Sequence, residues 1–309
     1  MNMKRFAKTL LLQSIRALPL GARRIIFDDL AKNMGDFKAA GDIAKIVGLT
    51  GFVAEGDAGA IRGALDDDAA LAKYARNGVW SPHESLLFKN LFAEQGGTYL
   101  DIGANIGLTV IPIAQNPQVA CYAFEPEPTN FRHLSENVFL NCRAGNVRLL
   151  NLALYDRDAS LPLQIAARHS GDHRISVIDV EGEMNEQDRK TISVPAKRLD
   201  DVITNMAKPL AAKIDVQGAE PFVIAGGRNT LSQASLLSLE FWPYSMRRMG
   251  GDLSAVIAFL TGHFQEGSIS PGDKDKQATW QPIVSVASFL HEFAKTDNHD
   301  YLDVTVRKA

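Results

Sequence analysis

The spacing of apolar residues changes along the chain and predicts two kinds of architecture. Residues 1–47 repeat apolar side chains at helical intervals, in one run that Pro19 and Gly21 interrupt and a second run over residues 24–34. Residues 48–65 are punctuated by glycines between β-type residues, a pattern typical of a short hairpin. The first part of the chain is therefore predicted to be a helical cap that ends in a hairpin.

Two further helices are predicted before the pattern changes. Asp66 to Asp68 can cap a helix over residues 69–76. Ser81-Pro82 begins the next helix, because proline is tolerated at the first helical position, where its missing N–H is not needed. Gly96-Gly97 ends this helix, whose predicted apolar side consists of Leu86, Leu87, Leu91 and Phe92.

From Thr98 onward, short apolar strands alternate with helices. This rhythm predicts an α/β fold, in which helices cover both faces of a mostly parallel sheet. Pro112 lies inside the first helix of this region and is expected to kink it near Leu108. The expected strands cover residues 98–100, 120–124, 147–154, 211–216, 236–241 and 301–306, and the expected helices extend to residue 114 and over residues 129–140, 221–231 and 253–260.

One polar stretch interrupts the alternation. Residues 160–165 and 191–195 have β-type patterning and flank the segment from Arg168 to Lys190, which we expect to run over the surface. We therefore predict two parts, an N-terminal cap over residues 1–80 and an α/β domain over residues 81–309.

A glycine-rich turn follows the first strand of the alternating region. Over residues 99–107 the sequence reads Tyr-Leu-Asp-Ile-Gly-Ala-Asn-Ile-Gly, so a strand leads into a turn and a helix begins after it. Glycine lets the backbone approach a ligand closely, and a helix N-terminus offers free N–H groups. We therefore expect a nucleotide-like cofactor to be held by Asp101, Gly103, Ala104, Asn105 and Gly107.

The type of cofactor follows from the glycine pattern and the charge. A nicotinamide dehydrogenase has the pattern G-x-G-x-x-G, but counted from Gly103 its second and third glycines are Asn105 and Leu108 here. Asp101 at the strand end would repel a pyrophosphate and attract the ammonium group of a methionine moiety. The pattern favours S-adenosyl-L-methionine, with a dinucleotide-dependent oxidoreductase as the alternative.

Two more strand ends complete the predicted cofactor site. Glu125 ends the next strand, where a carboxylate can accept both ribose hydroxyls, and Pro126 turns the chain away from the strand. Near the end of the third strand, Ala153 and Leu154 are candidate contacts for the adenine. The alternative for these two residues is ordinary strand core.

Polar side chains gather at the ends of the fourth and fifth strands. Lys213, Asp215 and Gln217 alternate, so their side chains share one face. Glu220 falls in the first turn of the next helix, and Glu240 ends the fifth strand at the same rim of the sheet. Open α/β sheets bind ligands at this rim. Asp215, Glu220 and Glu240 are therefore the candidate catalytic residues.

These motifs together resemble the FkbM family of methyltransferases over roughly residues 80–309. The resemblance implies a class I, Rossmann-like enzyme that methylates hydroxyl oxygens of sugars or natural products, and it adds Glu84 to the cofactor residues. The chain departs from the family at Gln217, where the family usually has a glutamate. The matching segments are residues 101–107, 124–126, 198–201, 213–215, 218–220 and 239–240.

A methyltransferase of this kind aligns a hydroxyl acceptor with the methyl group, and a general base removes its proton. Asp215 and Glu220 are the first candidates for the base, with Glu240 behind them, although Asp215 can equally well contact the amino group of the cofactor. A divalent metal held by the three acids is a further alternative, and Gln217 raises that of a cofactor-binding protein without catalysis. Weaker candidates for the base are His83, His169, His173 and His263.

Composition limits the partners and the location. The chain has 309 residues and a net charge of −3, so it has no excess of positive charge for a nucleic acid. Two cysteines are too few for a disulfide framework, and no apolar stretch reaches the about 20 residues of a membrane span. No cleavage site of a signal peptide follows the N-terminal residues. We expect a cytoplasmic enzyme with a small hydroxylated acceptor, and the N-terminal helices are a candidate homo-oligomer interface.

Overall fold

The computed structural model describes residues 51–65, 67, 69–176, 189–272, 274–296 and 299–308. The two helices expected within residues 1–47, and the oligomer interface expected on them, lie outside the described residues. Within the described ranges, no helix has both the length and the apolar character needed to cross a membrane.

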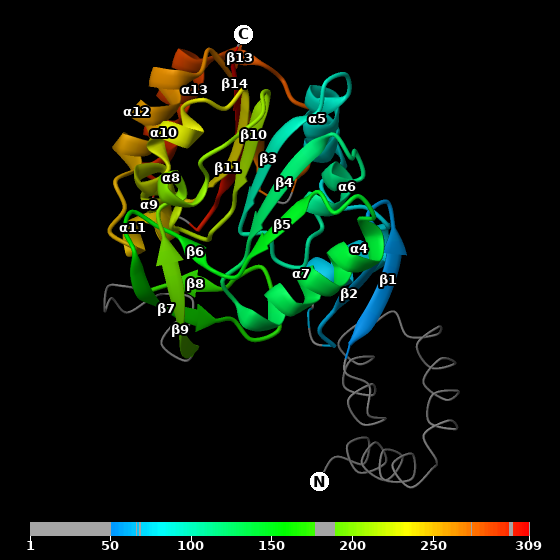
Figure 1. The fold of residues 1–309 in the computed structure, drawn as a ribbon. Helices are drawn as coiled ribbons and strands as arrows, with labels where there is room; N and C mark the ends of the chain where they lie inside the picture. The colour runs from blue at the N-terminus through cyan, green and yellow to red at the C-terminus, as the bar shows by residue number, and fades with distance from the viewer. Residues whose placement is uncertain are drawn as a thin grey trace, which may run out of the picture.

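A sheet of eight strands lies at the centre of the described chain (Figure 1). Its strands follow the order β13-β12-β14-β11-β10-β3-β4-β5, and the five from β11 to β5 are parallel. The predicted α/β class with a mostly parallel sheet is therefore confirmed. The strands are β3 (Gly97–Ile102), β4 (Val119–Phe124), β5 (Val147–Leu150), β10 (Leu210–Ile214), β11 (Leu236–Phe241), β12 (Glu266–Pro271), β13 (Gln281–Pro282) and β14 (Leu302–Arg307).

Helices cover both faces of this sheet (Figure 1). One face carries α4 (Ala70–Asn77), α5 (Pro82–Phe92), α6 (Val110–Ala114) and α7 (Pro128–Asn141). The other carries α8 (Leu199–Val202), α9 (Glu220–Gly226), α10 (Arg228–Leu231), α12 (Leu253–His263) and α13 (Ile283–Phe293), while α11 (Pro243–Arg248) follows β11.

Each face has its own hydrophobic core because side chains alternate along a strand. In β3, Tyr99 packs against Phe88 and Phe92 of α5, whereas Leu100 and Ile102 belong to the core on the opposite face. All six residues of β3 are buried, which explains why its sequence reads as a strand covered on both sides.

The hairpin predicted near residue 50 is present, with antiparallel strands β1 (Phe52–Gly56) and β2 (Gly59–Gly63). It packs against α7, where the side chain of Asn137 both accepts from the backbone N–H of Arg62 and donates to its carbonyl oxygen. Ile61 belongs to the same core as Tyr99. The described part of the predicted cap is therefore packed directly on the α/β domain.

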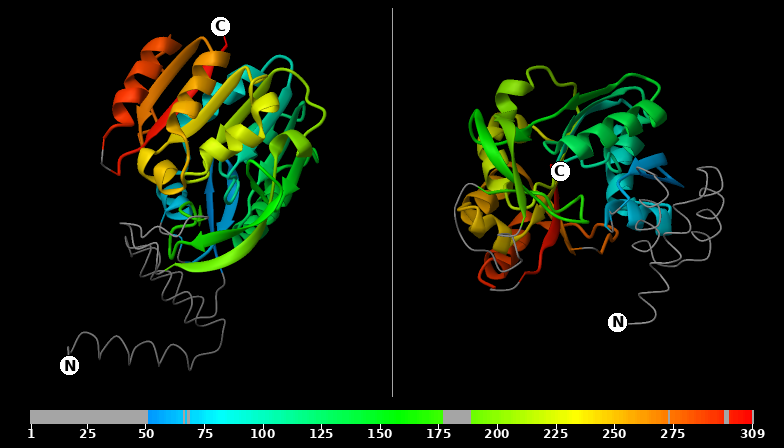
Figure 2. Two further views of the ribbon diagram at one scale, coloured as in Figure 1. Left: turned by 90° about the vertical axis from the view of Figure 1, so that its left-hand side faces the viewer. Right: turned by 90° about the horizontal axis from the view of Figure 1, so that it is seen from below.

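A second sheet leaves the main one after β5 and has the order β6-β9-β7-β8. Its strands are β6 (Ala153–Leu154), β7 (Ala159–Ile165), β8 (Arg174–Ile175) and β9 (Lys190–Lys197). Figure 1 and the left view of Figure 2 show that this small sheet lies below the central one. The strand predicted over residues 147–154 is thus two short strands in two different sheets.

Three local predictions were wrong. The helix after the glycine turn begins only at Val110, so Pro112 lies in its first turn, where it breaks no helical hydrogen bond and no kink follows. Leu86 is 54% exposed, because α5 buries the face of Ser85, Phe88 and Phe92 instead. The polar stretch after Arg168 is not wholly a surface excursion, since Arg174 in β8 is 1% exposed; residues 177–188 lie outside the described residues.

Candidate functional site

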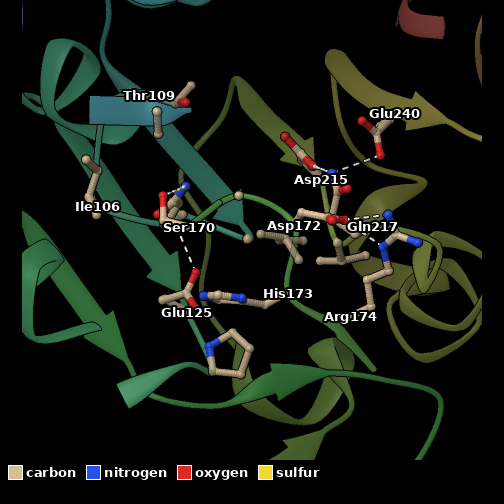
Figure 3. A pocket seen from close by; sticks show the side chains of 18 of the residues that line it. Ile106, Thr109, Glu125, Ser170, Asp172, His173, Arg174, Asp215, Gln217 and Glu240 are labelled. Atoms are coloured by element: carbon tan, nitrogen blue, oxygen red, sulfur yellow. Dashed lines mark hydrogen bonds and ion pairs between the residues drawn. The ribbon is translucent and has the colours of Figure 1, made fainter. Parts of the chain in front are cut away.

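A cavity of about 530 Å³ opens at the carboxyl ends of β3, β4, β10 and β11 (Figure 3). This is the edge at which open α/β sheets bind their ligands. The predicted residues that line it are Gly103, Ala104, Asn105, Glu125, Pro126, Ala153, Leu154, Asp215 and Glu240. Four other predicted residues do not line it, namely Glu84, Asp101, Gly107 and Glu220.

The glycine turn is held against two neighbouring strands. Gly103 has a φ of 87°, and a Cβ at this position would overlap the backbone oxygen of Asp215 after β10. The backbone N–H groups of Gly103 and Ala104 donate to the carbonyl of Phe124, over 3.0 and 2.9 Å. These two donors are therefore used inside the protein, and the turn is a rigid wall of the cavity.

Glu125 lies at the end of β4 and links the turn to the next helix. Its Oε2 accepts from the backbone N–H of Asn105 at 2.9 Å, and its Oε1 accepts from that of Glu127 at 2.8 Å. Burial raises the pKa of Glu125 to about 8, and the two N–H donors only partly offset this effect. The carboxyl group is thus oriented toward the cavity by backbone contacts alone.

Asp101 lies at the carboxyl end of β3, as predicted, but its side chain does not line the cavity. Its side chain is 0% exposed, and neither carboxyl oxygen has a hydrogen-bond partner among the described residues. Burial raises its pKa to about 7, and Lys213 opposes that shift. Alternation along β3 places Asp101 on the face of Tyr99, which α5 and α6 cover. Asp101 does not line the cavity, so the direct contact of this side chain with a ligand ammonium group stays a prediction.

Glu220 is a structural carboxylate in this fold. Its two oxygens accept from the backbone N–H groups of Val216 and Gly218, both at 2.9 Å, and its side chain is fully buried. Burial raises its pKa to about 7. Glu220 closes the turn after β10 and does not line the cavity, so its role as a base stays a prediction.

Gly107 and Glu84 also lie outside the main cavity. A Cβ on Gly107 would come within 2.9 Å of Leu134 Cδ1, so this glycine allows α7 to pack closely. Glu84 lines a smaller polar cavity of about 120 Å³, which shares Lys213 with the larger one, and it accepts from Ser238 Oγ at 2.6 Å. Neither residue is placed to contact a ligand in the main cavity directly.

A connected polar cluster on one wall of the cavity consists of Lys213, Asp215, Gln217 and Glu240, the last three of which are labelled in Figure 3. Lys213 Nζ lies 2.9 Å from Asp215 Oδ2, while Gln217 Nε2 donates to Asp215 Oδ1 at 2.8 Å and to Glu240 Oε2 at 3.0 Å. The sequence predicted that these side chains gather at one rim of the sheet. The amide bridge between the two carboxylates is seen only in the structure.

The two carboxyl groups of this cluster differ in their electrostatics. Burial raises the pKa of Asp215, but the Lys213 ammonium group and the Gln217 amide outweigh it and hold that pKa below its usual range. Burial also raises the pKa of Glu240 well above its usual range, and the Asp215 and Glu220 carboxylates add to the effect. Asp215 is therefore the charged partner, and Glu240 the stronger base once it is ionised.

A wall that the sequence did not predict comes from the segment between β7 and β8. Ser170 accepts from Asn105 Nδ2 at 3.2 Å and donates to Asp67 Oδ2 at 2.7 Å, and its carbonyl accepts from Asn130 Nδ2 at 2.8 Å. Asp67 also accepts from three backbone N–H groups at the start of α4. One serine thus ties the glycine turn to α4 and α7, which no sequence spacing indicates.

Aromatic and basic groups complete the cavity. The guanidinium group of Arg174 lies 4.5 Å from the ring centre of Trp242 and forms an ion pair with Asp172 at 2.6 Å. Trp80 and Tyr301 also line the cavity. These residues come from segments far apart in the chain, so their assembly could not be predicted.

Of the four weaker histidine candidates, only His169 and His173 line the cavity. The Nδ1 atom of His173 accepts from the backbone N–H of Ala166 at 3.1 Å, so in the neutral ring the proton lies on Nε2. Burial lowers the pKa of His173, and the neutral ring therefore has no nitrogen left to take a proton from an acceptor. Within the described ranges, no group of three or more histidine, cysteine or acidic residues is arranged to hold a metal ion.

Comparison with known proteins identifies the family to which this chain belongs. A family model described as the methyltransferase FkbM domain matches residues 101–302, which is almost two thirds of the chain. The 2-O-methyltransferase NoeI of Sinorhizobium fredii is 30% identical over 175 residues, covering 52% of this chain and 70% of the relative. The hexuronic acid methyltransferase AglP of Haloferax volcanii is 32% identical over 154 residues, covering 48% of this chain and 57% of the relative.

Among solved structures, the methyltransferase FkbM of Methylobacillus flagellatus KT is similar with a TM-score of 0.40 and 12% identity. The match covers 68% of this chain and 44% of that one. The chain therefore spans little more than half of the hexuronic acid methyltransferase and less than half of the solved structure.

Proposed function

The chain belongs to the FkbM family of S-adenosylmethionine-dependent methyltransferases, and from this premise we propose that it methylates a hydroxyl oxygen of a sugar or a similar small molecule. The observation that carries the proposal is a single cavity that joins the glycine turn and Glu125 to the acid pair Asp215 and Glu240. The names of the relatives, a 2-O-methyltransferase and a hexuronic acid methyltransferase, support the acceptor class. The family match leaves no support for the dinucleotide-dependent alternative.

The residues of the turn and of β4 fit the cofactor. Asn105 lines the cavity, and its Oδ1 has no hydrogen-bond partner among the described residues, so an acceptor is available for an N–H or O–H group of the cofactor. Each Glu125 oxygen accepts one backbone N–H and retains a lone pair for a ribose hydroxyl. Pro126, Ala153 and Leu154 provide the apolar surface for the adenine. We propose that these residues hold the cofactor.

The bound cofactor supplies a methyl group on a positively charged sulfur, which is electrophilic without further activation. The protein's task is then to place the acceptor and remove its proton. We propose that Glu240 is the general base, because its pKa is raised and it lines the cavity. Asp215, which Lys213 keeps ionised, contributes a fixed negative charge beside the reacting atoms. The rings of Trp80 and Tyr301 also line the cavity and offer apolar surface for a sugar ring.

The test separates binding from transfer. Isothermal titration with S-adenosylhomocysteine measures cofactor affinity, and transfer of a labelled methyl group to a panel of monosaccharides and glycosides measures activity. Glu240→Gln is expected to keep the affinity and to reduce transfer about 10²- to 10⁴-fold, the range of general-base catalysis. Glu266→Gln is the control, since Glu266 pairs with Arg307 and does not line the cavity. Absence of cofactor binding by the unmodified protein would refute the proposal.

Three further predictions accompany this function. We propose that residues 1–80 form a cap on the methyltransferase domain of residues 81–309, that the N-terminal segment contributes to a homo-oligomer, and that the enzyme is cytoplasmic. Sedimentation of the full chain tests the second of these. A monomer at micromolar concentration would contradict it.

A further inference from the structure

Gln217 stands between the two carboxylates of the polar cluster, and its side-chain amide cannot act as a base. We infer that Gln217 is the positioning residue of the acceptor-activating pair: its side-chain amide joins Asp215 and Glu240 through two N–H donors, and the pair therefore needs no shared cation. The inference rests on the proposed function of Glu240 as the base. It explains why an amide is compatible with catalysis at this position.

The geometry of the bridge is well defined. Gln217 Nε2 lies 2.8 Å from Asp215 Oδ1 and 3.0 Å from Glu240 Oε2, so each hydrogen of the amide is directed to a different carboxylate (Figure 3). The opposite orientation of the amide would set its oxygen against two carboxylates, and their repulsion excludes it. The amide is therefore a donor to both acids.

The backbone keeps this side chain in place. Gln217 has a φ of 57°, a left-handed conformation that is uncommon for residues other than glycine and marks functional positions. Its carbonyl accepts from Ser245 Oγ at 2.6 Å, and the Glu220 carboxylate binds the N–H groups on either side of it, of Val216 and Gly218. Glu220, which does not reach the cavity, thus acts by fixing the turn that aims Gln217.

The charges around Glu240 show why such a bridge matters. Asp215 after β10, Glu220 on α9 and Asp303 on β14 place negative charge near Glu240, and Lys213 on β10 opposes them. Two carboxylates held this close need a hydrogen, a proton or a cation between them. The amide supplies two hydrogens and adds no charge, so Glu240 is oriented without a bridging cation.

A glutamate at position 217 would reverse this arrangement. It would place a third carboxylate within reach of Asp215 and Glu240 and would have no hydrogen to donate unless it were protonated. Three oxygen ligands on one wall are a suitable site for a hard divalent cation. The residue at position 217 therefore decides between an amide-bridged pair and a cation-bridged one, and this chain has the amide.

The inference is tested with two variants and two readouts. Gln217→Met removes both N–H groups at similar size, and we expect the turnover number to fall about tenfold to a hundredfold while the affinity for S-adenosylhomocysteine changes less than about twofold. Gln217→Glu is nearly isosteric, and we expect the rising limb of its pH–rate profile to move upward by roughly one pH unit. Gln233→Glu is the control, because the exposed side-chain amide of Gln233, just after α10, donates to the carbonyl of Asn229 and does not line the cavity.

The second readout needs no turnover. Electron paramagnetic resonance with Mn²⁺ alone is expected to show binding to Gln217→Glu and none to the unmodified protein, and EDTA is expected to leave the activity of the unmodified protein unchanged. Loss of activity in EDTA with recovery in Mn²⁺, or an unaltered turnover number and pH profile in Gln217→Met, would overturn the inference. If the unmodified protein binds no S-adenosylhomocysteine, the proposed function fails, and the Mn²⁺ comparison still tests the bridge.

Discussion

The two halves of the cavity are defined by different parts of the chain, the backbone in one half and side chains in the other. The half proposed for the cofactor is defined by backbone: the turn at Gly103, the N–H groups that hold Glu125, and the short strand at Ala153. The half proposed for the acceptor is defined by side chains, in which Lys213 and Gln217 organise two acids. Backbone geometry serves a cofactor of constant shape, whereas side chains can be exchanged to suit a particular acceptor.

The acids of the two halves are also held differently. Glu125 is a single carboxyl group whose oxygens are fixed by two backbone N–H donors. Glu240 depends on another side chain, Gln217, and on the charge of Asp215 beside it. Changes in the cofactor half should therefore alter affinity, and changes in the acceptor half should alter turnover.

The largest effect is expected where the halves meet. Gly103→Ala would drive a Cβ into the backbone oxygen of Asp215, so both halves should be displaced, with loss of cofactor binding and a fall of more than about 3 kcal/mol in the free energy of unfolding. Thermal unfolding and titration with S-adenosylhomocysteine measure the two effects.

Gly145→Ala is the matched control for Gly103→Ala. Gly145 has a φ of 66°, also left-handed, but a Cβ there would meet open space. The free energy of unfolding should therefore fall by only about 1 kcal/mol in Gly145→Ala, which is the cost of the backbone strain. Equal losses in the two variants would show that conformation alone matters and that the close approach of β3 and β10 does not.

The second prediction isolates the cofactor half. At pH 9, where the Glu125 carboxyl group is ionised, Glu125→Gln removes the charge that the ribose hydroxyls would bind, and a charge-assisted hydrogen bond of about 1.5–3 kcal/mol corresponds to an affinity for S-adenosylhomocysteine that is about 10- to 100-fold weaker. The turnover number at saturating cofactor should change only a few-fold. An unchanged affinity together with a loss of turnover would contradict the assignment of Glu125 to cofactor binding.

A third prediction concerns pH, because both halves contain buried acids with raised pKa values. The pKa values of Asp101 and Glu220 are about 7, and that of Glu125 about 8, whereas in an unfolded chain these groups ionise near pH 4. The folded protein therefore binds more protons than the unfolded chain between pH 4.5 and 8, and its stability should fall as pH rises through that range.

Scanning calorimetry at pH 5, 7 and 8.5 measures this dependence as a falling melting temperature, by about 2–4 °C for each kcal/mol lost. Glu125→Gln and Glu240→Gln each remove one acid with a raised pKa, so the melting temperature of each variant should fall less steeply with pH than that of the unmodified protein. A melting temperature that rises over the same range would contradict the raised pKa values.

The smallest effect is expected at the link between the turn and the wall. Ser170→Ala removes the hydroxyl that joins Asn105 to Asp67, a neutral hydrogen bond worth about 1 kcal/mol, so affinity for S-adenosylhomocysteine should fall about fivefold. Ser160→Ala is the control, since Ser160 bonds only to Ser193 at an exposed position of the same small sheet. Identical titrations for the two variants would exclude a role of the wall in cofactor binding.

Prediction from sequence was most successful for elements with a strong local pattern. The helix that begins at Ser81-Pro82 and the strands β3, β4, β10 and β11 lie within a few residues of their predicted bounds, because two-sided burial leaves a continuous apolar run. The prediction failed where packing selects among weak patterns. Leu86 is exposed and Phe88 buried, and β12 escaped notice because its sequence contains a single large apolar residue, Ile269.

The sequence by itself determined the α/β class, the glycine turn and the rim at which Glu125, Asp215 and Glu240 gather, because strand ends and glycines act through local backbone geometry. Only the tertiary structure shows which of the predicted acids line the cavity. Strand alternation buries Asp101 behind the turn, backbone N–H groups occupy Glu220, and the left-handed backbone of Gln217 directs its amide between two carboxylates. These outcomes depend on contacts between distant segments, and the order of residues along one strand does not specify them.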